Sequence, residues 1–145
     1  MDRGRPEVGA VVDTNVVAYY VLGTAPFAGE VREFWHAVKD PLAPALWEAE
    51  LANVIWMAIR SGLIAPDEGR LRLQLAEGLA IRSVAVSSLW QGALARAVTA
   101  GLAVYDTLFV ELALRENLSL ATFDSKVLKA FPRVAKRPSE LLLRK

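Results

Sequence analysis

The chain has 145 residues and a mass of 15.8 kDa, a size at which one domain can bury its own hydrophobic core. Although 54% of the residues are hydrophobic, charged residues, Pro or Gly interrupt the apolar stretches before they reach the roughly 20 residues of a membrane-spanning helix. The net charge of +1 excludes a simple DNA-coating protein, and the lack of cysteine excludes disulfides, zinc–thiolate sites and thiol nucleophiles. Residues 1–10 contain no apolar run, so we expect no signal peptide, a cytoplasmic location and a single domain over residues 1–145.

Short apolar runs alternate with segments of helical periodicity along the chain. Residues 8–12 predict a first strand, and residues 15–22 and 27–38 predict two helices separated by a break at residues 23–26. Pro41 and Pro44 bracket a brief second strand at residues 42–43. Residues 45–60 then predict a buried helix, because they are apolar on nearly all sides and end before Gly62.

The alternation continues in the second half of the chain. Residues 66 to about 80 predict a helix, residues 83–86 a third strand, and residues 87–100 and 106–117 two helices separated by Gly101. Residues 118–122 predict a strand, residues 125–131 a short helix and residues 134–135 an edge strand, followed by a basic tail from Lys136. Such alternation favours an α/β fold, which we expect to be a three-layer α/β/α sandwich with a short, mostly parallel central sheet.

Three aspartates, Asp13, Asp106 and Asp124, stand near the start of a predicted helix. Each one could simply cap its helix, since Asp is a favoured N-cap residue. The carboxyl ends of parallel strands meet at one edge of a sheet, however, so acids placed there converge even when they are far apart in sequence. Clustered carboxylates raise one another's pKa unless a cation neutralises them. Oxygen ligands without His or Cys favour Mg²⁺ or Mn²⁺ over zinc.

A glutamate in the helix predicted at residues 45–60 is expected to join these aspartates. Glu48 and Glu50 project about 200° apart on a helix, so only one of them can easily face the site. Glu48 lies in the first turn, where the positive end of the helix stabilises an exposed acid. Glu50 lies deeper in the apolar segment, with Asn53 on the same face to satisfy it, so we expect Glu50 to be the site residue.

Four segments, in this order along the chain, resemble the PIN-domain family, particularly the VapC-type toxins of toxin–antitoxin pairs. They are residues 11–15 (VVDTN), 50–56 (ELANVIW), 105–107 (YDT) and 120–124 (LATFD). The resemblance implies an endoribonuclease that hydrolyses RNA with Mg²⁺ or Mn²⁺ as cofactor. It implies an acidic catalytic and metal site with polar support from three further residues; the acids are Asp13, Glu50, Asp106 and Asp124, and the support is Thr14, Asn15 and Thr122. We rank Asp124 below the other acids, because the fourth acid is the least constant position of the family.

The resemblance also implies protein partners, namely a cognate antitoxin that occupies a groove near residues 27–38 and a second copy of the chain in a homodimer. The basic residues after Asp124 have two possible roles, since they either contact an RNA backbone or only keep a sheet edge soluble; they are Lys126, Lys129, Arg133, Lys136 and Arg137.

Two alternative functions keep the acidic site. One is RNA processing or DNA cleavage by a PIN-like nuclease. The other is a non-enzymatic, receiver-like α/β module that binds Mg²⁺. A receiver would want adjacent acids after the first strand and a lysine after the last one, whereas Asp13 stands alone and Lys136 is poorly placed.

Overall fold

The computed structural model describes residues 7–143. Its centre is a five-stranded sheet in the order β3-β2-β1-β4-β5, in which every pair of neighbouring strands is parallel. The strands are β1 (Ala10–Val12), β2 (Leu42–Pro44), β3 (Arg82–Val84), β4 (Ser119–Ala121) and β5 (Ala135–Lys136). The helices are α1 (Thr14–Leu22), α2 (Ala28–Ala37), α3 (Leu46–Arg60), α4 (Pro66–Glu77), α5 (Trp90–Ala100), α6 (Val104–Glu116), α7 (Ser125–Ala130) and α8 (Pro138–Leu142), with a 3₁₀ turn η1 (Val86–Ser88).

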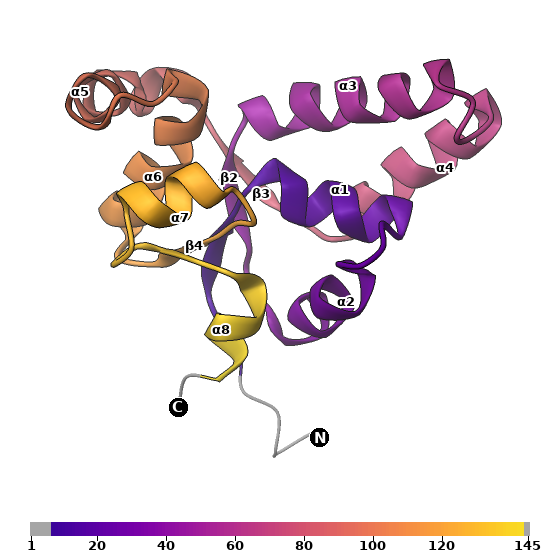
Figure 1. Cartoon of the computed structure of the whole chain (residues 1–145), viewed down its shortest axis with the longest axis horizontal. Helices are drawn as coiled ribbons and strands as arrows, with labels where there is room; N and C mark the ends of the chain where they lie inside the picture. The colour runs from indigo at the N-terminus through magenta and orange to yellow at the C-terminus, as the bar shows by residue number, and fades with distance from the viewer. Residues whose placement is uncertain (1–6, 144–145) are drawn as a thin grey trace.

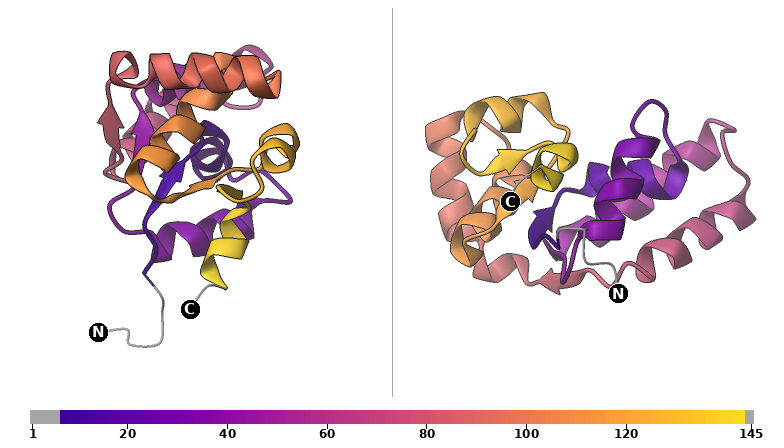
Figure 2. Two further views of the ribbon diagram at one scale, coloured as in Figure 1. Left: turned by 90° about the vertical axis from the view of Figure 1, so that its left-hand side faces the viewer. Right: turned by 90° about the horizontal axis from the view of Figure 1, so that it is seen from below.

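The helices cover both faces of the sheet, as the sequence predicts. Figure 1 shows α1 and α2 with the α3–α4 hairpin on one side of the strands, and α5 and α6 on the other. The same separation is visible from below in Figure 2, where α1–α4 and α5–α7 stand on opposite sides of β1. The predicted α/β/α sandwich is therefore confirmed, with a sheet that is wholly parallel over the described residues.

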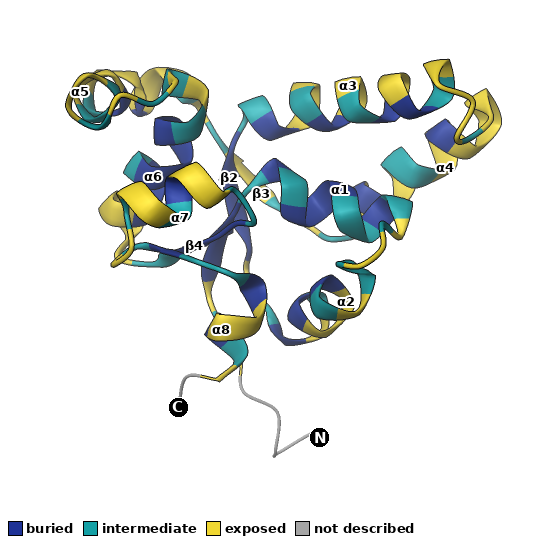
Figure 3. Ribbon diagram, in the orientation of Figure 1, coloured by how far each residue is buried: buried dark blue, intermediate teal, exposed yellow. Residues whose placement is uncertain are grey.

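The central strands are buried on both faces, which explains why their sequence shows an apolar run without alternation. Val11 and Val12 of β1 and Leu120 of β4 are fully covered. Phe34 of α2 and Phe109 of α6 are among the largest buried side chains of the same core. In Figure 3 the buried residues of the helices face the sheet, and exposed residues follow the outer faces of α3 and α4. The packing fixes the strands, and their carboxyl ends are thereby fixed as well.

The main errors of the predicted elements lie at their ends. The first strand starts at Ala10 instead of residue 8, and Val8 forms only an isolated bridge with Val38. The third strand ends at Val84, because the chain turns into η1 before α5 begins at Trp90. The fifth strand lies one residue later than predicted. The predicted basic tail is wrong, since α8 follows β5 with Pro138 at its first turn and buried Leu141 on its inner face.

No single helix among residues 7–143 is long and apolar enough to cross a membrane. Helices α5 and α6 reach that length and composition only when they are taken together, and the chain bends by 116° between them.

Candidate active site

The strand order reverses beside β1. The chain builds β1, β2 and β3 in one direction and then returns to place β4 on the other side of β1. Ligands of open α/β sheets bind at such a reversal, outside the carboxyl ends of the strands. Val12 is paired in register with Ala121, so Asp13 and Thr122 leave the sheet side by side at this point. The order also differs from the 2-1-3-4-5 order of receiver modules, so the fold gives that alternative no support.

The carboxylate of Asp13 is held by two hydrogen bonds. Its Oδ1 accepts from the backbone N–H of Thr14 at 2.7 Å, and its Oδ2 accepts from the Thr122 hydroxyl at 2.7 Å. Asp13 is thus the N-cap of α1, as its position predicts. Burial, with smaller contributions from the charges of Glu50 and Asp106, raises the pKa of Asp13 from 3.8 to about 7 against the effect of both hydrogen bonds. An acid that only caps a helix is expected to stay ionised, so the raised pKa of Asp13 indicates a role besides capping α1.

Glu50 reaches the same place from α3. Its Oε1 accepts a hydrogen bond of 2.6 Å from the hydroxyl of Thr14, the residue next to Asp13. Burial and the charge of Asp106 raise the pKa of Glu50, although the bond from Thr14 opposes them. Glu48 is exposed, in agreement with the choice between the two glutamates. The expectation for Asn53 is not met, because Asn53 is exposed and the hydrogen bond seen on Glu50 comes from Thr14.

Asp106 comes to the site by a different route from the one expected. Helix α6 begins at Val104 and its N-cap is Ala103, so Asp106 lies within the first turn and caps nothing. The element before it is α5, a helix that ends at Gly101 in the left-handed conformation, as the sequence predicts. Helix α6 packs on β1, β2 and β4, which brings Asp106 towards the other acids. Burial and the charge of Asp124 raise the pKa of Asp106, whereas Lys126 lowers it.

Asp124 is the N-cap of α7, and its Oδ1 accepts from the backbone N–H groups of Lys126 and Val127. Its own backbone N–H donates to the Thr122 hydroxyl at 3.0 Å, and that hydroxyl donates in turn to Asp13. The side-chain oxygen of Asn15 accepts from the backbone N–H of Phe123 at 3.3 Å. Thr122 and Asn15 therefore tie the segment after β4 to the segment after β1.

The four acids are electrostatic neighbours. Asp106 raises the pKa of both Asp13 and Glu50, and Asp124 raises that of Asp106. Within residues 7–143, no three acidic or histidine side chains are already gathered as tightly as the ligands of a bound ion. The donor set consists of oxygen atoms alone, and three of its carboxyl groups resist ionisation, so a hard divalent cation fits it.

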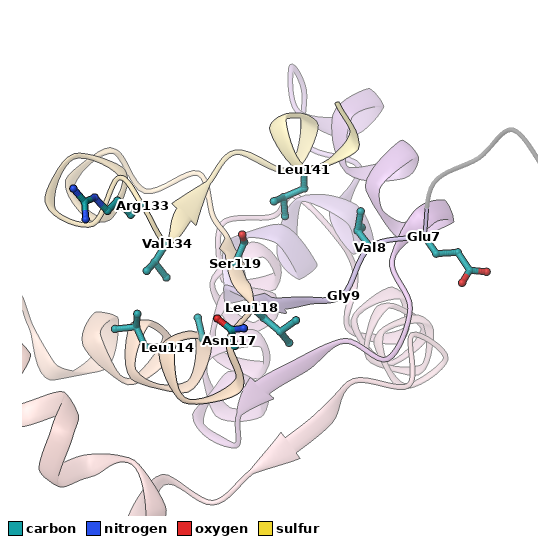
Figure 4. A pocket seen from close by; sticks show the side chains of 11 residues that line it. Glu7, Val8, Gly9, Leu114, Asn117, Leu118, Ser119, Arg133, Val134 and Leu141 are labelled. Carbon is teal, nitrogen blue, oxygen red and sulfur yellow. The ribbon is translucent and has the colours of Figure 1, made fainter. Parts of the chain in front are cut away.

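A hollow of about 430 Å³ lies elsewhere, at the opposite edge of the sheet (Figure 4). Gly9 precedes β1, Leu118 precedes β4 and Val134 precedes β5, and all three line it. None of the predicted site residues is among its lining residues. The hollow lies at the amino ends of the strands, whereas the acids lie near their carboxyl ends. We place the candidate active site at the acids, because their side chains offer groups that can take part in chemistry.

Arg137 also lies at the acidic edge, although the sequence pattern indicates it only as one of the basic residues after Asp124. Ala121 of β4 is paired with Lys136 of β5, so Arg137 leaves the sheet beside Thr122. The sequence carries a signal for this position, because Arg137 directly follows a strand, as Asp13 does. The prediction of the fifth strand at residues 134–135 hides that signal, because it leaves Arg137 two residues beyond the strand.

The comparisons with known proteins agree with this geometry. The model of the PIN domain family matches residues 10–137, which contain all four acids. The fold is similar to that of VapBC2 from Rickettsia felis, in a crystal structure bound to a DNA fragment from its promoter, with a TM-score of 0.61, 13% sequence identity, and coverage of 90% of this chain and 98% of the other. It is also similar to FitAcB from Neisseria gonorrhoeae, with a TM-score of 0.60, 19% identity, and coverage of 89% and 97%. No curated protein sequence matches the chain. Because the family model spans most of the chain, this protein belongs to the PIN domain family.

Proposed function

We propose that the protein is a metal-dependent endoribonuclease that hydrolyses phosphodiester bonds of RNA. The observation that carries this proposal is the group of coupled acids at the reversal of strand order, in which burial and neighbouring charges raise the pKa of Asp13 to about 7. Perturbed acids that share a crevice are candidates for catalytic groups. PIN domains are generally nucleases, which supports this function.

All four acids would be metal ligands, and two of them, Asp13 and Glu50, are also held in place by threonine hydroxyls. Asp13, Glu50, Asp106 and Asp124 would hold Mg²⁺ or Mn²⁺, which supplies a Lewis acid for attack of water on phosphorus and charge stabilisation for the leaving oxygen. The chain's own polar groups orient those acids. The Thr14 N–H and the Thr122 hydroxyl each fix one oxygen of Asp13, which keeps a further lone pair on each oxygen for a ligand. The Thr14 hydroxyl fixes Oε1 of Glu50 and leaves Oε2 for a ligand.

The test is incubation of the purified protein with a defined RNA, and with single-stranded DNA of the same sequence, in Mg²⁺, Mn²⁺ or EDTA. We expect the RNA to be cut in the presence of either metal and to survive in EDTA. Cleavage that continues in EDTA would contradict the metal requirement. Preferential cleavage of the DNA would contradict the substrate class and favour the DNA-cleaving alternative.

Asp13→Asn is the first variant to test. It keeps the size of the side chain but removes its charge and replaces one accepting oxygen by an NH₂ group that can only donate, so we expect cleavage to fall by more than about a hundredfold, beyond the loss typical of residues that only support a ligand. Circular dichroism should show an unchanged fold. A folded variant that cleaves RNA at the original rate would remove Asp13 from the mechanism.

Glu50→Gln and Glu48→Gln form a matched pair on one helix. Glu50 is half-buried and bonded to Thr14, whereas Glu48 is exposed on the first turn of α3. We expect Glu50→Gln to reduce cleavage by at least about tenfold and Glu48→Gln to leave it unchanged. Equal losses in the two variants would show that general charge on α3, not the position of Glu50, supports the reaction.

The proposal extends to the protein's partners. VapBC2 and FitAcB support the role of toxin in a toxin–antitoxin pair, with an antitoxin as the cognate protein partner. Large apolar side chains on the α3–α4 hairpin are exposed, including Trp56, Met57 and Leu71, and offer a surface for such a partner. Trp90, Leu94 and Val98 form a second exposed stripe along α5, which supports a homodimer. Co-expression with the neighbouring reading frame, followed by light scattering of the purified complex, tests both associations.

A further inference from the structure

Arg137 forms an ion pair that joins two distant parts of the chain. Its Nη2 donates to Oε1 of Glu30 at 2.6 Å, and its Nε faces the other carboxylate oxygen at 3.4 Å. That second oxygen also accepts from the backbone N–H of Ser139 at 3.0 Å. Burial alone would raise the pKa of Glu30, but the bonds from Arg137 and Ser139 outweigh it and lower the pKa. The pair thus fastens the start of α8 to the first turn of α2.

The same guanidinium lies over an aromatic cluster. The Cζ atom of Arg137 is 4.7 Å from the ring centre of Phe123 and 5.8 Å from that of Phe27. The two rings are 4.9 Å apart, and the ring of Tyr19 stacks on Phe27 at 4.6 Å. A guanidinium within about 6 Å of a ring centre is attracted by the ring's electrons. Glu30 thus binds the N–H groups of Arg137 while the ring of Phe123 lies next to its Cζ atom.

Phe123 lies between two residues of the acidic site. On one side Thr122 donates to Oδ2 of Asp13, and on the other side Asp124 is coupled to Asp106. The backbone N–H of each of the three residues 122–124 donates to a different acceptor, namely the Lys136 carbonyl, the Asn15 side chain and the Thr122 hydroxyl. A movement of the Phe123 ring would therefore displace Thr122 and Asp124 together.

We propose that the Glu30–Arg137 ion pair is a positioning device for the acidic site, which acts through the Phe123 ring to hold residues 122–124 against Asp13. Arg137 is a positioning residue and not a contact for RNA, because its guanidinium is paired with Glu30 and lies over the rings of Phe123 and Phe27. This assignment replaces, for Arg137, the two roles considered for the basic residues after Asp124. The purpose of this positioning, which is to orient ligands of a metal-dependent nuclease, rests on the proposed function.

The chain contains a matched control for this ion pair. Arg96 Nε donates to Glu111 at 2.7 Å, and the side chains of Arg96 and Glu111 are 38% and 20% exposed. The corresponding values for Arg137 and Glu30 are 2.6 Å, 42% and 16%. The Arg96 pair joins α5 to α6 and carries no ring that belongs to the acidic site. Arg137→Gln and Arg96→Gln therefore remove equivalent charges, and only the first should disturb residues 122–124.

The first measurement is amide hydrogen exchange of the full chain in EDTA. We expect Arg137→Gln to speed exchange of the Thr122, Phe123 and Asp124 amides by about tenfold relative to the β1 amides, through local opening, and Arg96→Gln to leave that ratio unchanged. Glu30→Gln should act in the same direction as Arg137→Gln. Exchange that accelerates equally throughout the chain in Arg137→Gln would mean a merely structural pair and would overturn the proposal.

The second measurement is calorimetric titration of Mn²⁺ into the same proteins. Arg137→Gln should weaken Mn²⁺ binding by about tenfold, as residues that orient ligands usually do, and Arg96→Gln should not change it. Arg137→Lys should recover part of the affinity, because the charge remains but the planar fork is lost. Unchanged affinity in Arg137→Gln would overturn the proposal. Failure of the wild-type protein to cut RNA would refute the proposed function alone, since hydrogen exchange still decides the role of the pair.

Discussion

Asp13 combines two demands that conflict at neutral pH. As the cap of α1 it must accept hydrogen bonds, which favours the ionised form. Its burial and its acidic neighbours favour the neutral form more strongly, so its pKa rises to about 7. A residue selected only to close a helix would stay ionised and stabilise the protein. The raised pKa means that the ionised form of Asp13 opposes folding of the metal-free protein, as is common where charged groups are gathered in one place.

The pH dependence of stability should reveal this conflict. In the unfolded chain Asp13 loses its proton near pH 3.8, but in the folded protein it keeps it until about pH 7. Between these values the folded state binds more protons, so the free energy of unfolding falls as pH rises, by at most about 4 kcal/mol for this group, and levels off above pH 7. Urea unfolding in EDTA at pH 5 and pH 8 should show a smaller fall for Asp13→Asn than for the wild type. Equal falls in both proteins would contradict the raised pKa.

The sequence predicts the four acids and, by resemblance, Thr14 and Thr122 as polar support, but it does not predict which acid each threonine bonds. Asp13 and Asp124 could be predicted because each stands after an apolar strand, where the fold class alone gives the position. The bond between Thr14 and Glu50 spans 36 positions, and the bond between Thr122 and Asp13 spans 109. Helical periodicity instead suggested Asn53, which is near Glu50 in sequence but exposed. Long-range pairing depends on how α1, α3 and β4 pack, which no local pattern contains.

At the scale of elements, the strands and helices of the interior could be predicted and the connections could not. Asp106 was expected at a helix start after the pattern of Asp13, yet α6 begins at Val104 because Ala103 supplies the extended residue before the first turn. The position of Arg137 at a strand end could not be predicted because β5 has only two residues, too few to show periodicity. Short edge elements take their position from their neighbours, here from the pairing of Ala121 with Lys136.

The close packing of α3 against α4 leads to a prediction about the stability of a glycine variant at their contact. A Cβ at Gly69 of α4 would lie 2.7 Å from Cδ1 of Ile59 and 3.1 Å from Cγ2 of Ile55, whereas a Cβ at Gly29 of α2 would meet nothing within 4 Å. Alanine is favoured over glycine in a helix by up to about 1 kcal/mol, but overpacking costs about 1–3 kcal/mol. Gly69→Ala should therefore lower the free energy of unfolding by about 1 kcal/mol, while Gly29→Ala raises it. Urea unfolding measures the free energy of unfolding of both variants, and changes of the same sign would contradict the predicted overpacking at Gly69.

For the molecule as a whole, the acidic site exists only in the folded chain. Asp13 follows β1, Glu50 belongs to α3, Asp106 to α6 and Asp124 precedes α7, so unfolding separates all four carboxylates. Their mutual repulsion opposes folding, and a cation that binds them together would favour it. The proposed metal should therefore act as a stabilising ligand of the entire fold, with a gain that depends on pH because protons compete for the same oxygens.

This linkage can be measured without any RNA. At a free Mn²⁺ concentration of about a hundred times Kd, the gain for one site is about 2.7 kcal/mol, which corresponds to a rise in Tm of roughly 5–10 °C for a chain of this size. We expect that rise at pH 8 in the wild type and in Glu48→Gln, and a much smaller one in Asp13→Asn. At pH 5.5 the rise should shrink in the wild type, since protonated Asp13 cannot accept the ion without losing its proton. A rise of equal size in Asp13→Asn, or one that is independent of pH, would mean that Mn²⁺ binds elsewhere and that these acids do not form its site.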